Sequence, residues 1–171
     1  MEDFKVLFSR EDLEKRVKEM AVEIDSDYNG KEIIAVCVLK GAVFFATDLL
    51  RNMKTPLSLD FLRASSYEGT ESTGKVNLDM EITTDIEGKD VLVVEDIADT
   101  GNTLKFLVDY LKSKNPKSLR VAVLLDKKER RTVEIDLDYT GFVIPNKFVV
   151  GYGFDIDQKS RNLPYIGYVE N

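Results

Sequence analysis

The sequence predicts an α/β fold, with a single domain built on a mostly parallel twisted sheet that helices flank. Three largely apolar runs predict buried strands, because a parallel sheet is covered on both faces and its strands lose the alternation of half-exposed strands. These runs are residues 33–39, 91–94 and 119–125. Segments with apolar residues at helical spacing separate them, as the crossover connections of a parallel sheet require.

The composition fits one globular domain and excludes several kinds of chemistry. The 171 residues are 43% hydrophobic, which is enough for one sizeable core and too little for two. No apolar stretch approaches the ~20 residues of a membrane span. Residues 1–5 lack the basic and apolar regions of a secretory signal, so a cytoplasmic location is expected. The net charge of −7 argues against a broad nucleic-acid surface.

Two residue types narrow the chemistry further. The chain contains no histidine, which removes imidazole acid/base catalysis and Ser/His triads. The single cysteine, Cys37, lies within the first apolar run, where a thiol is usually a small core residue and not a nucleophile. General bases are therefore expected among aspartate, glutamate, lysine and tyrosine.

The N-terminal third predicts a helix, a buried strand and a second helix. Ser9 and Asp12 form a capping pair at the start of the first helix. Its apolar residues recur at helical spacing: Leu13, Val17, Met20, Ala21 and Ile24. Asn29-Gly30 predicts a turn, and Lys40-Gly41 ends the strand at 33–39 before a mostly helical segment at 42–53.

Alternating segments follow in the middle of the chain. Residues 57–61 and 76–82 alternate with period two, which predicts half-exposed strands. The residues between them, 65–75, are small, polar and glycine-bearing. We expect a mobile loop or lid there.

The second half of the chain continues the strand and helix alternation. Gly88 predicts a turn before the run at 91–94, and a helix follows that run until Asn115-Pro116. A strand at 119–125, a hydrophilic stretch at 128–138 and short apolar strands complete the domain. Residues 165–169 are expected to close the sheet.

The most informative segment follows the run at 91–94. Glu95, Asp96 and Asp99 stand at the carboxyl end of a buried strand, and Thr100-Gly101-Asn102-Thr103 opens the next helix. Unpaired N–H groups at a helix start bind a phosphate without cationic side chains. The nearby carboxylates suit sugar hydroxyls, a divalent ion or a proton. Two alternatives remain for them: Glu95 and Asp96 in a solvated loop, and Asp99 as the helix N-cap.

Two glycine motifs are rejected as nucleotide-binding signatures. Residues 69–75 spell Gly-x-x-x-x-Gly-Lys, but Val76 stands where a P-loop needs Ser or Thr, and an alternating strand follows where a helix is required. Gly151-Tyr152-Gly153 starts a dinucleotide fingerprint, yet Ile156 replaces its third glycine. It predicts a chain reversal that lets backbone approach a ligand.

The segment 91–104 resembles the signature of the type I phosphoribosyltransferases, and the wording Glu-Asp-Ile-x-Asp-Thr-Gly-x-Thr-Leu is similar to their hypoxanthine-guanine branch. Four other segments resemble further loops of this family, in the same order and at compatible spacing: 38–41, 65–67, 124–127 and 144–152. The resemblance covers roughly residues 4–169. It implies a core of about residues 30–145 and a small hood formed by the terminal segments, about 1–15 and 145–171.

The resemblance implies how the sugar phosphate is bound. Phosphoribosyl diphosphate would place its 5-phosphate on the N–H and hydroxyl donors of Thr100, Gly101, Asn102 and Thr103. Its ribose hydroxyls would donate to Glu95 and Asp96. Asp99 would be the catalytic residue, acting as general base or hydrogen-bond partner near purine N7.

The resemblance also implies a diphosphate and metal site. Lys40, Gly41 and Arg161 would bind the diphosphate, with unusual backbone geometry at Lys40. Asp155, together with Glu95 and Asp96, would hold the cofactor Mg²⁺. Ser66 and Tyr67 would sit on a lid that excludes water. Ordinary surface positions are the alternative for Lys40 and Arg161.

A 6-oxopurine base is the implied acceptor. Phe148 would stack on the ring, Lys127 would donate to O6, and Val149 would offer backbone groups. Lys147 is assigned to the same pocket, with a contact to diphosphate or to a neighbouring subunit as alternatives. The alternative for Phe148 is core packing.

The implied activity is transfer of a phosphoribosyl group to hypoxanthine or guanine by a homodimer or homotetramer. Two other functions stay open. One is a transferase selective for xanthine or another base, and the other is a regulator that senses phosphoribosyl diphosphate and binds nucleic acid. The acidic charge argues against the regulator.

Overall fold

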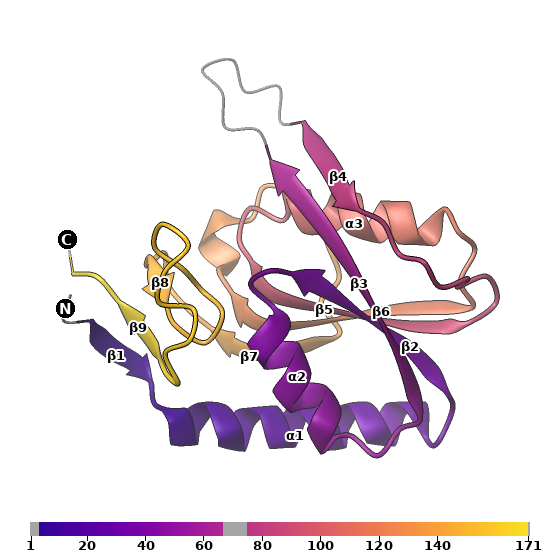
Figure 1. The fold of residues 1–171 in the computed structure, drawn as a ribbon, viewed down its shortest axis with the longest axis horizontal. Helices are drawn as coiled ribbons and strands as arrows, with labels where there is room; N and C mark the ends of the chain where they lie inside the picture. The colour runs from indigo at the N-terminus through magenta and orange to yellow at the C-terminus, as the bar shows by residue number, and fades with distance from the viewer. Residues whose placement is uncertain (1–3, 67–74, 171) are drawn as a thin grey trace.

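The computed structural model describes residues 4–66 and 75–170. Over these residues the strands form a large sheet and a small one (Figure 1). The helices are α1 (Arg10–Tyr28), α2 (Val43–Asn52) and α3 (Asn102–Lys112), with a 3₁₀ turn, η1, at Lys128–Arg130. The strands are β1 (Lys5–Phe8), β2 (Ile33–Leu39), β3 (Leu57–Ser66), β4 (Val76–Met80), β5 (Asp90–Ala98), β6 (Ser118–Asp126), β7 (Tyr139–Val143), β8 (Val149–Val150) and β9 (Ile166–Tyr168).

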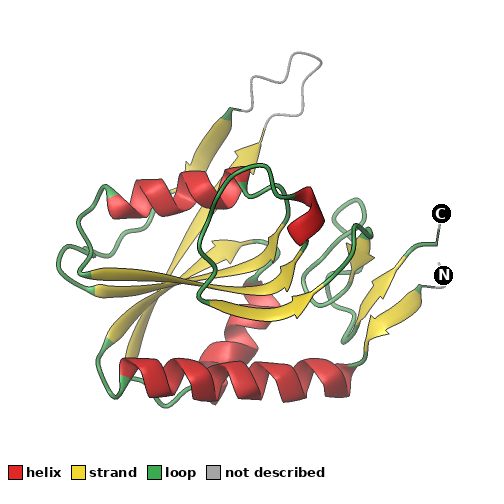
Figure 2. Cartoon of the chain, turned by 180° about the vertical axis from the view of Figure 1, so that it is seen from behind, coloured by secondary structure: helices red, strands yellow, loops and turns green. Residues whose placement is uncertain are grey.

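The large sheet confirms the predicted fold class. Its order over the described residues is β4-β3-β2-β5-β6-β7, and all neighbours pair in parallel except β4, which runs antiparallel to β3 at the edge. Helices α1 and α2 cover one face and α3 covers the other (Figure 2). Both faces of β2 and of residues 91–94 in β5 are therefore buried, which is why these residues are continuously apolar.

Helix α1 forms for the reasons that the sequence gives. Ser9 accepts a hydrogen bond from the Asp12 backbone N–H, and the Asp12 side chain accepts one from the Ser9 N–H, so the predicted capping box is present. The five apolar residues of its predicted buried face are each at most 1% exposed. The helix ends where Asn29 adopts a left-handed conformation with φ 48°.

One strand assignment was wrong. Residues 165–169 do not close the large sheet, because β9 pairs with β1 and β8 in a separate antiparallel sheet. This small sheet joins the two ends of the chain, with Lys5 opposite Tyr168, and it stands beside the large sheet (Figure 1). The boundaries of the predicted hood, at residues 15 and 145, stay a prediction.

Candidate functional site

The carboxyl ends of three neighbouring strands meet at one edge of the large sheet. β2 ends before Lys40-Gly41, β5 carries Glu95 and Asp96 near its end, and β6 is followed by Lys127. Ligands of open parallel sheets bind beyond the carboxyl ends of the strands. The order β2-β5-β6 therefore brings the predicted residues to one place.

The start of α3 is open to an anion. Its N-cap is Gly101, with φ 91° and no side-chain cap, and the Asn102 N–H makes only a long 3.4 Å contact to Thr100 Oγ1. A Cβ at Gly101 would lie 2.8 Å from Arg131 Cδ, and the positive φ would strain any other residue there, so both observations favour glycine. The alternative in which Asp99 caps the helix is wrong, because Gly101 holds that position.

Glycines allow two loops and the end of β5 to touch at the edge of the sheet. A Cβ at Gly41 would lie 1.7 Å from Asp96 Oδ2, and one at Gly153 would lie 1.9 Å from the Gly41 carbonyl oxygen. Gly153 also has φ 108°. The chain reversal predicted at residues 151–153 is thus the segment that packs on the Lys40-Gly41 loop, and the peptide bond between Leu39 and Lys40 is cis.

Glu95 and Asp96 form an acidic pair in which Glu95 is buried and Asp96 is half-buried. Glu95 is only 7% exposed, and its Oε1 accepts a 2.9 Å hydrogen bond from the Asp96 backbone N–H. Burial, and then the Asp96 carboxyl, raise the pKa of Glu95 well above its ordinary value. Burial also raises the pKa of Asp96. The solvated-loop alternative is wrong for Glu95. A buried carboxylate next to a half-buried one favours a cation or hydroxyl donors between them.

Lys40 and Arg161, the two cations predicted to bind diphosphate, lie together. The amide oxygen of Gln158 accepts from Lys40 Nζ at 3.1 Å and from Arg161 at 3.2 Å. Arg161 also donates to the Gly153 carbonyl at 2.7 Å. Because two cations converge on one neutral oxygen, an anionic oxygen at this position would be strongly attracted. Sequence reasoning missed Gln158.

Asp155 lies in the same loop but does not complete a cluster of metal ligands. Its carboxylate contacts Arg161 at 2.9 Å and accepts from the Gln158 backbone N–H at 2.8 Å. No group of three or more potential ligands stands together in the described part of the chain. The predicted set of Asp155, Glu95 and Asp96 is therefore not assembled by the protein alone.

A charged cluster surrounds Asp99. Its Oδ1 accepts from Arg130 Nε at 2.7 Å, and its Oδ2 lies 3.8 Å from Lys127 Nζ. Lys127 is 8% exposed, so it is not an ordinary solvated lysine. Arg131 forms an ion pair with the buried Asp126 and donates to the Asp99 carbonyl at 3.2 Å. Sequence reasoning missed both arginines, which belong to a stretch that looks merely hydrophilic.

Of the residues predicted to bind the base, Phe148 is exposed, whereas Val149 and Lys147 contact β9 of the small sheet. Phe148 is 60% exposed, so the core-packing alternative is wrong. Val149 is buried and pairs with Tyr168 in the small sheet. Lys147 Nζ lies 3.6 Å above the centroid of the Tyr168 ring, where it makes a cation–π contact with the small sheet.

The predicted lid begins at the end of β3. Ser66 is exposed and pairs with Val76 of β4. Tyr67 lies outside the described residues. The structure thus places the base of the predicted lid on the edge hairpin formed by β3 and β4.

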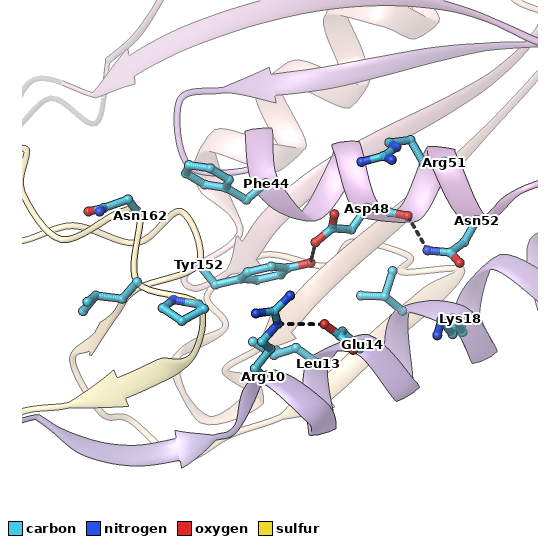
Figure 3. A pocket seen from close by; sticks show the side chains of 13 residues that line it. Arg10, Leu13, Glu14, Lys18, Phe44, Asp48, Arg51, Asn52, Tyr152 and Asn162 are labelled. Carbon is cyan, nitrogen blue, oxygen red and sulfur yellow. Dashed lines mark hydrogen bonds and ion pairs between the residues drawn. The ribbon is translucent and has the colours of Figure 1, made fainter.

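A separate cavity of about 630 Å³ lies between α1, α2 and residues 162–164, and none of the predicted site residues line it. Tyr152 reaches into this region and donates to Asp48 Oδ2 at 2.6 Å, while Arg10 pairs with Glu14 at 2.8 Å (Figure 3). The Tyr152 contact ties the loop at 151–153 to α2. We assign the site to the strand ends, because the uncapped start of α3 and the acidic pair Glu95 and Asp96 lie there.

Comparisons with known proteins agree with this geometry. A family model of the phosphoribosyl transferase domain matches residues 6–157. The chain belongs to the phosphoribosyltransferase family.

The similar proteins narrow the class further. The chain is 46% identical to the hypoxanthine-guanine phosphoribosyltransferase of Streptococcus thermophilus, over 97% of this chain and 93% of that protein. A crystal structure of such an enzyme from Bacillus anthracis, with HEPES in its active site, is 49% identical, has a TM-score of 0.93 and covers 98% of this chain and 100% of its own. Within the family, the chain belongs to the hypoxanthine-guanine branch.

Some similar proteins are much longer. The chain is 48% identical to part of the bifunctional protein TilS/HprT of Listeria monocytogenes, over 97% of this chain but only 26% of that protein. No helix in the described residues is long and apolar enough to cross a membrane.

Proposed function

We propose that this chain transfers the 5-phosphoribosyl group of phosphoribosyl diphosphate to N9 of hypoxanthine or guanine, giving IMP or GMP and diphosphate. One observation supports this most: a helix start without a side-chain cap, an acidic pair with a buried glutamate, and a pair of cations converge where β2 and β5 end. Each part suits one part of this substrate, namely the 5-phosphate, the ribose hydroxyls and the diphosphate.

The sugar would be anchored by the loop that opens α3. Thr100, Gly101, Asn102 and Thr103 offer backbone N–H groups and hydroxyls, at the positive end of the α3 dipole, to the 5-phosphate. Glu95 and Asp96, which precede this loop at the end of β5, would accept from the ribose hydroxyls. The sugar is then fixed at both ends, so that its C1 faces the base.

The residues present fit a magnesium ion as well. Mg²⁺ is usually held by one or two carboxylates together with substrate phosphates and waters, so a complete protein cage is not needed. Glu95, Asp96 and Asp155 are the residues that would hold it. Together with Lys40 and Arg161, the ion would neutralise charge on the leaving diphosphate. Gly41 has no side chain, which leaves room for the Asp96 carboxylate.

The base would bind beside Asp99. Lys127 would donate to O6, which attracts a 6-oxopurine and disfavours the amino group of adenine. Phe148 would stack on the ring, and Val149 and Lys147 would complete the pocket from the small sheet. As N9 attacks C1, the bond from C1 to diphosphate breaks and Asp99 receives the proton from N7. Ser66 and Tyr67 would exclude water from the developing carbocation.

A spectrophotometric assay of nucleotide formation tests the proposal. Purified protein is mixed with phosphoribosyl diphosphate, Mg²⁺ and either hypoxanthine, guanine, xanthine or adenine. We expect conversion of the first two, little of adenine, and loss of activity when EDTA removes the metal. Conversion of xanthine alone would favour the xanthine-selective alternative. No conversion of any base, together with salt-dependent binding of RNA or DNA, would favour the sensor.

Replacing Phe148 with Ala should weaken binding of the base. The ring is 60% exposed, so its removal leaves the core intact. Loss of stacking on a base costs about 1 to 2 kcal/mol, which raises KM for hypoxanthine roughly 10-fold. KM for phosphoribosyl diphosphate should change little. Phe106→Ala, at an exposed phenylalanine of α3, is the control. Equal KM values for hypoxanthine in wild type and F148A would contradict the stacking role.

The oligomeric state and the cellular location are two further parts of the proposal. Assembly as a homodimer or homotetramer is proposed from the family resemblance, and analytical ultracentrifugation tests it. A cytoplasmic location stays a prediction. The bifunctional similar proteins carry sequence beyond the part matched here, so any further activity of a longer protein lies outside this proposal.

A further inference from the structure

We propose that Arg130 is a positioning residue that orients the Asp99 carboxylate toward the purine; this rests on the proposed role of Asp99. Arg130 Nε donates to Asp99 Oδ1 at 2.7 Å. The second oxygen, Oδ2, lies 3.8 Å from Lys127 Nζ. The two cations therefore approach different oxygens of one carboxylate.

The two contacts differ in a way that divides their roles. At 2.7 Å the contact from Arg130 is a charge-assisted hydrogen bond, whereas 3.8 Å exceeds hydrogen-bond distance for Lys127. Lys127 can therefore turn to the purine O6 without breaking a hydrogen bond to Asp99. Arg130 stays on Oδ1, which leaves Oδ2 as the oxygen that faces N7, the atom next to O6 on the purine edge.

Backbone hydrogen bonds hold the segment that carries Lys127 and Arg130 against the segment that carries Asp99. The Lys127 N–H donates to the Ala98 carbonyl at 3.0 Å, and the Thr132 N–H donates to the Thr100 carbonyl at 2.9 Å. The 3₁₀ turn between them is closed by the Arg130 N–H, which donates to the Lys127 carbonyl at 3.0 Å. The backbone that carries Arg130 is thus fixed against the backbone that carries Asp99. The remaining freedom lies in the two side chains, which the hydrogen bond between them restrains.

The ion pair is too exposed to matter much for folding. The Arg130 and Asp99 side chains are 45% and 40% exposed, and exposed pairs contribute little to stability. Replacing Arg130 should therefore leave the fold intact while freeing the Asp99 carboxylate to rotate. This separates a positioning role from a structural one.

Steady-state kinetics of Arg130→Ala test the proposal. We expect kcat to fall about 10-fold, because a misplaced general base loses the alignment that the reaction needs, with KM for phosphoribosyl diphosphate unchanged. Arg130→Lys should recover most of the loss, since one donor suffices for a single contact. Lys128→Ala removes an exposed cation from the same turn and is the matched control, with wild-type kcat.

A double-mutant cycle shows whether Arg130 acts through Asp99. Asp99→Asn alone should lower kcat about 100-fold, and adding Arg130→Ala to it should cost nothing further. A full 10-fold loss from R130A in the D99N background would overturn the positioning role while leaving the proposed role of Asp99 intact. Wild-type kcat in R130A would also overturn it. Wild-type kcat in D99N would instead overturn the role of Asp99, and the inference with it.

Discussion

Replacing Gly41 with Ala is expected to abolish transferase activity, with at least a 100-fold loss of kcat/KM for phosphoribosyl diphosphate. The added Cβ would stand 1.7 Å from Asp96 Oδ2, and the Asp96 side chain is held by the Ile97 N–H, which donates to its other oxygen at 2.6 Å. Either the carboxylate or the loop after β2 must move. A shift of about 1 Å at a binding group costs roughly that much activity.

The same substitution should lower the free energy of unfolding by about 1 to 3 kcal/mol, as overpacking of a close contact does. Urea denaturation measures this, and initial rates at varied phosphoribosyl diphosphate measure the kinetic loss. Gly88→Ala is the control, since nothing lies within 4 Å of a Cβ there. Its positive φ of 67° predicts a small loss of stability and full activity. Wild-type kinetics in G41A would show that the Asp96 carboxylate has no required position.

The elements that the sequence predicts well are those with a local signal. The capping pair at Ser9 and Asp12 and the apolar spacing after it determine α1 without reference to the rest of the chain. β2 and the first part of β5, residues 91–94, are continuously apolar because both faces are covered. The pairing of β9 is different. Its partner β1 lies at the other end of the chain, and no local pattern says which sheet a three-residue strand joins.

The same distinction applies to the site. Gly101, Glu95 and Asp96 belong to a sequence motif, so their place at the end of β5 could be predicted. Gln158 and Arg130 belong to no such motif. Gln158 reaches the two cations because its backbone has a φ of 64°. A positive φ is uncommon for glutamine, so the sequence does not predict this conformation. Arg130 stands in a run of charged residues, which is usually a solvated surface, and only the 3₁₀ turn brings it to Asp99.

Replacing Glu95 with Gln should stabilise the ligand-free protein and inactivate it. Because the pKa of Glu95 is raised in the folded state, folding takes up protons between the ordinary glutamate value and the raised one. The free energy of unfolding of the wild type should therefore fall as pH rises through this window, and it should be lowest where Glu95 is fully ionised. Gln has no charge to bury, so E95Q should unfold with about 1 to 3 kcal/mol more free energy at pH 8.

Activity should change in the opposite direction, because the ionised carboxylate is what accepts from a ribose hydroxyl and attracts Mg²⁺. We expect at least a 30-fold loss of kcat/KM for phosphoribosyl diphosphate, from about 2 kcal/mol of lost binding.

Urea denaturation between pH 5 and pH 8, without ligand, compares the wild type with E95Q and with Glu87→Gln, an exposed glutamate in the turn before β5. The control should follow the wild type at every pH. If E95Q is less stable than the wild type at pH 8, the buried charge is compensated within the fold and does not need a ligand. If it is more stable and inactive, the acidic pair lowers stability in order to bind substrate.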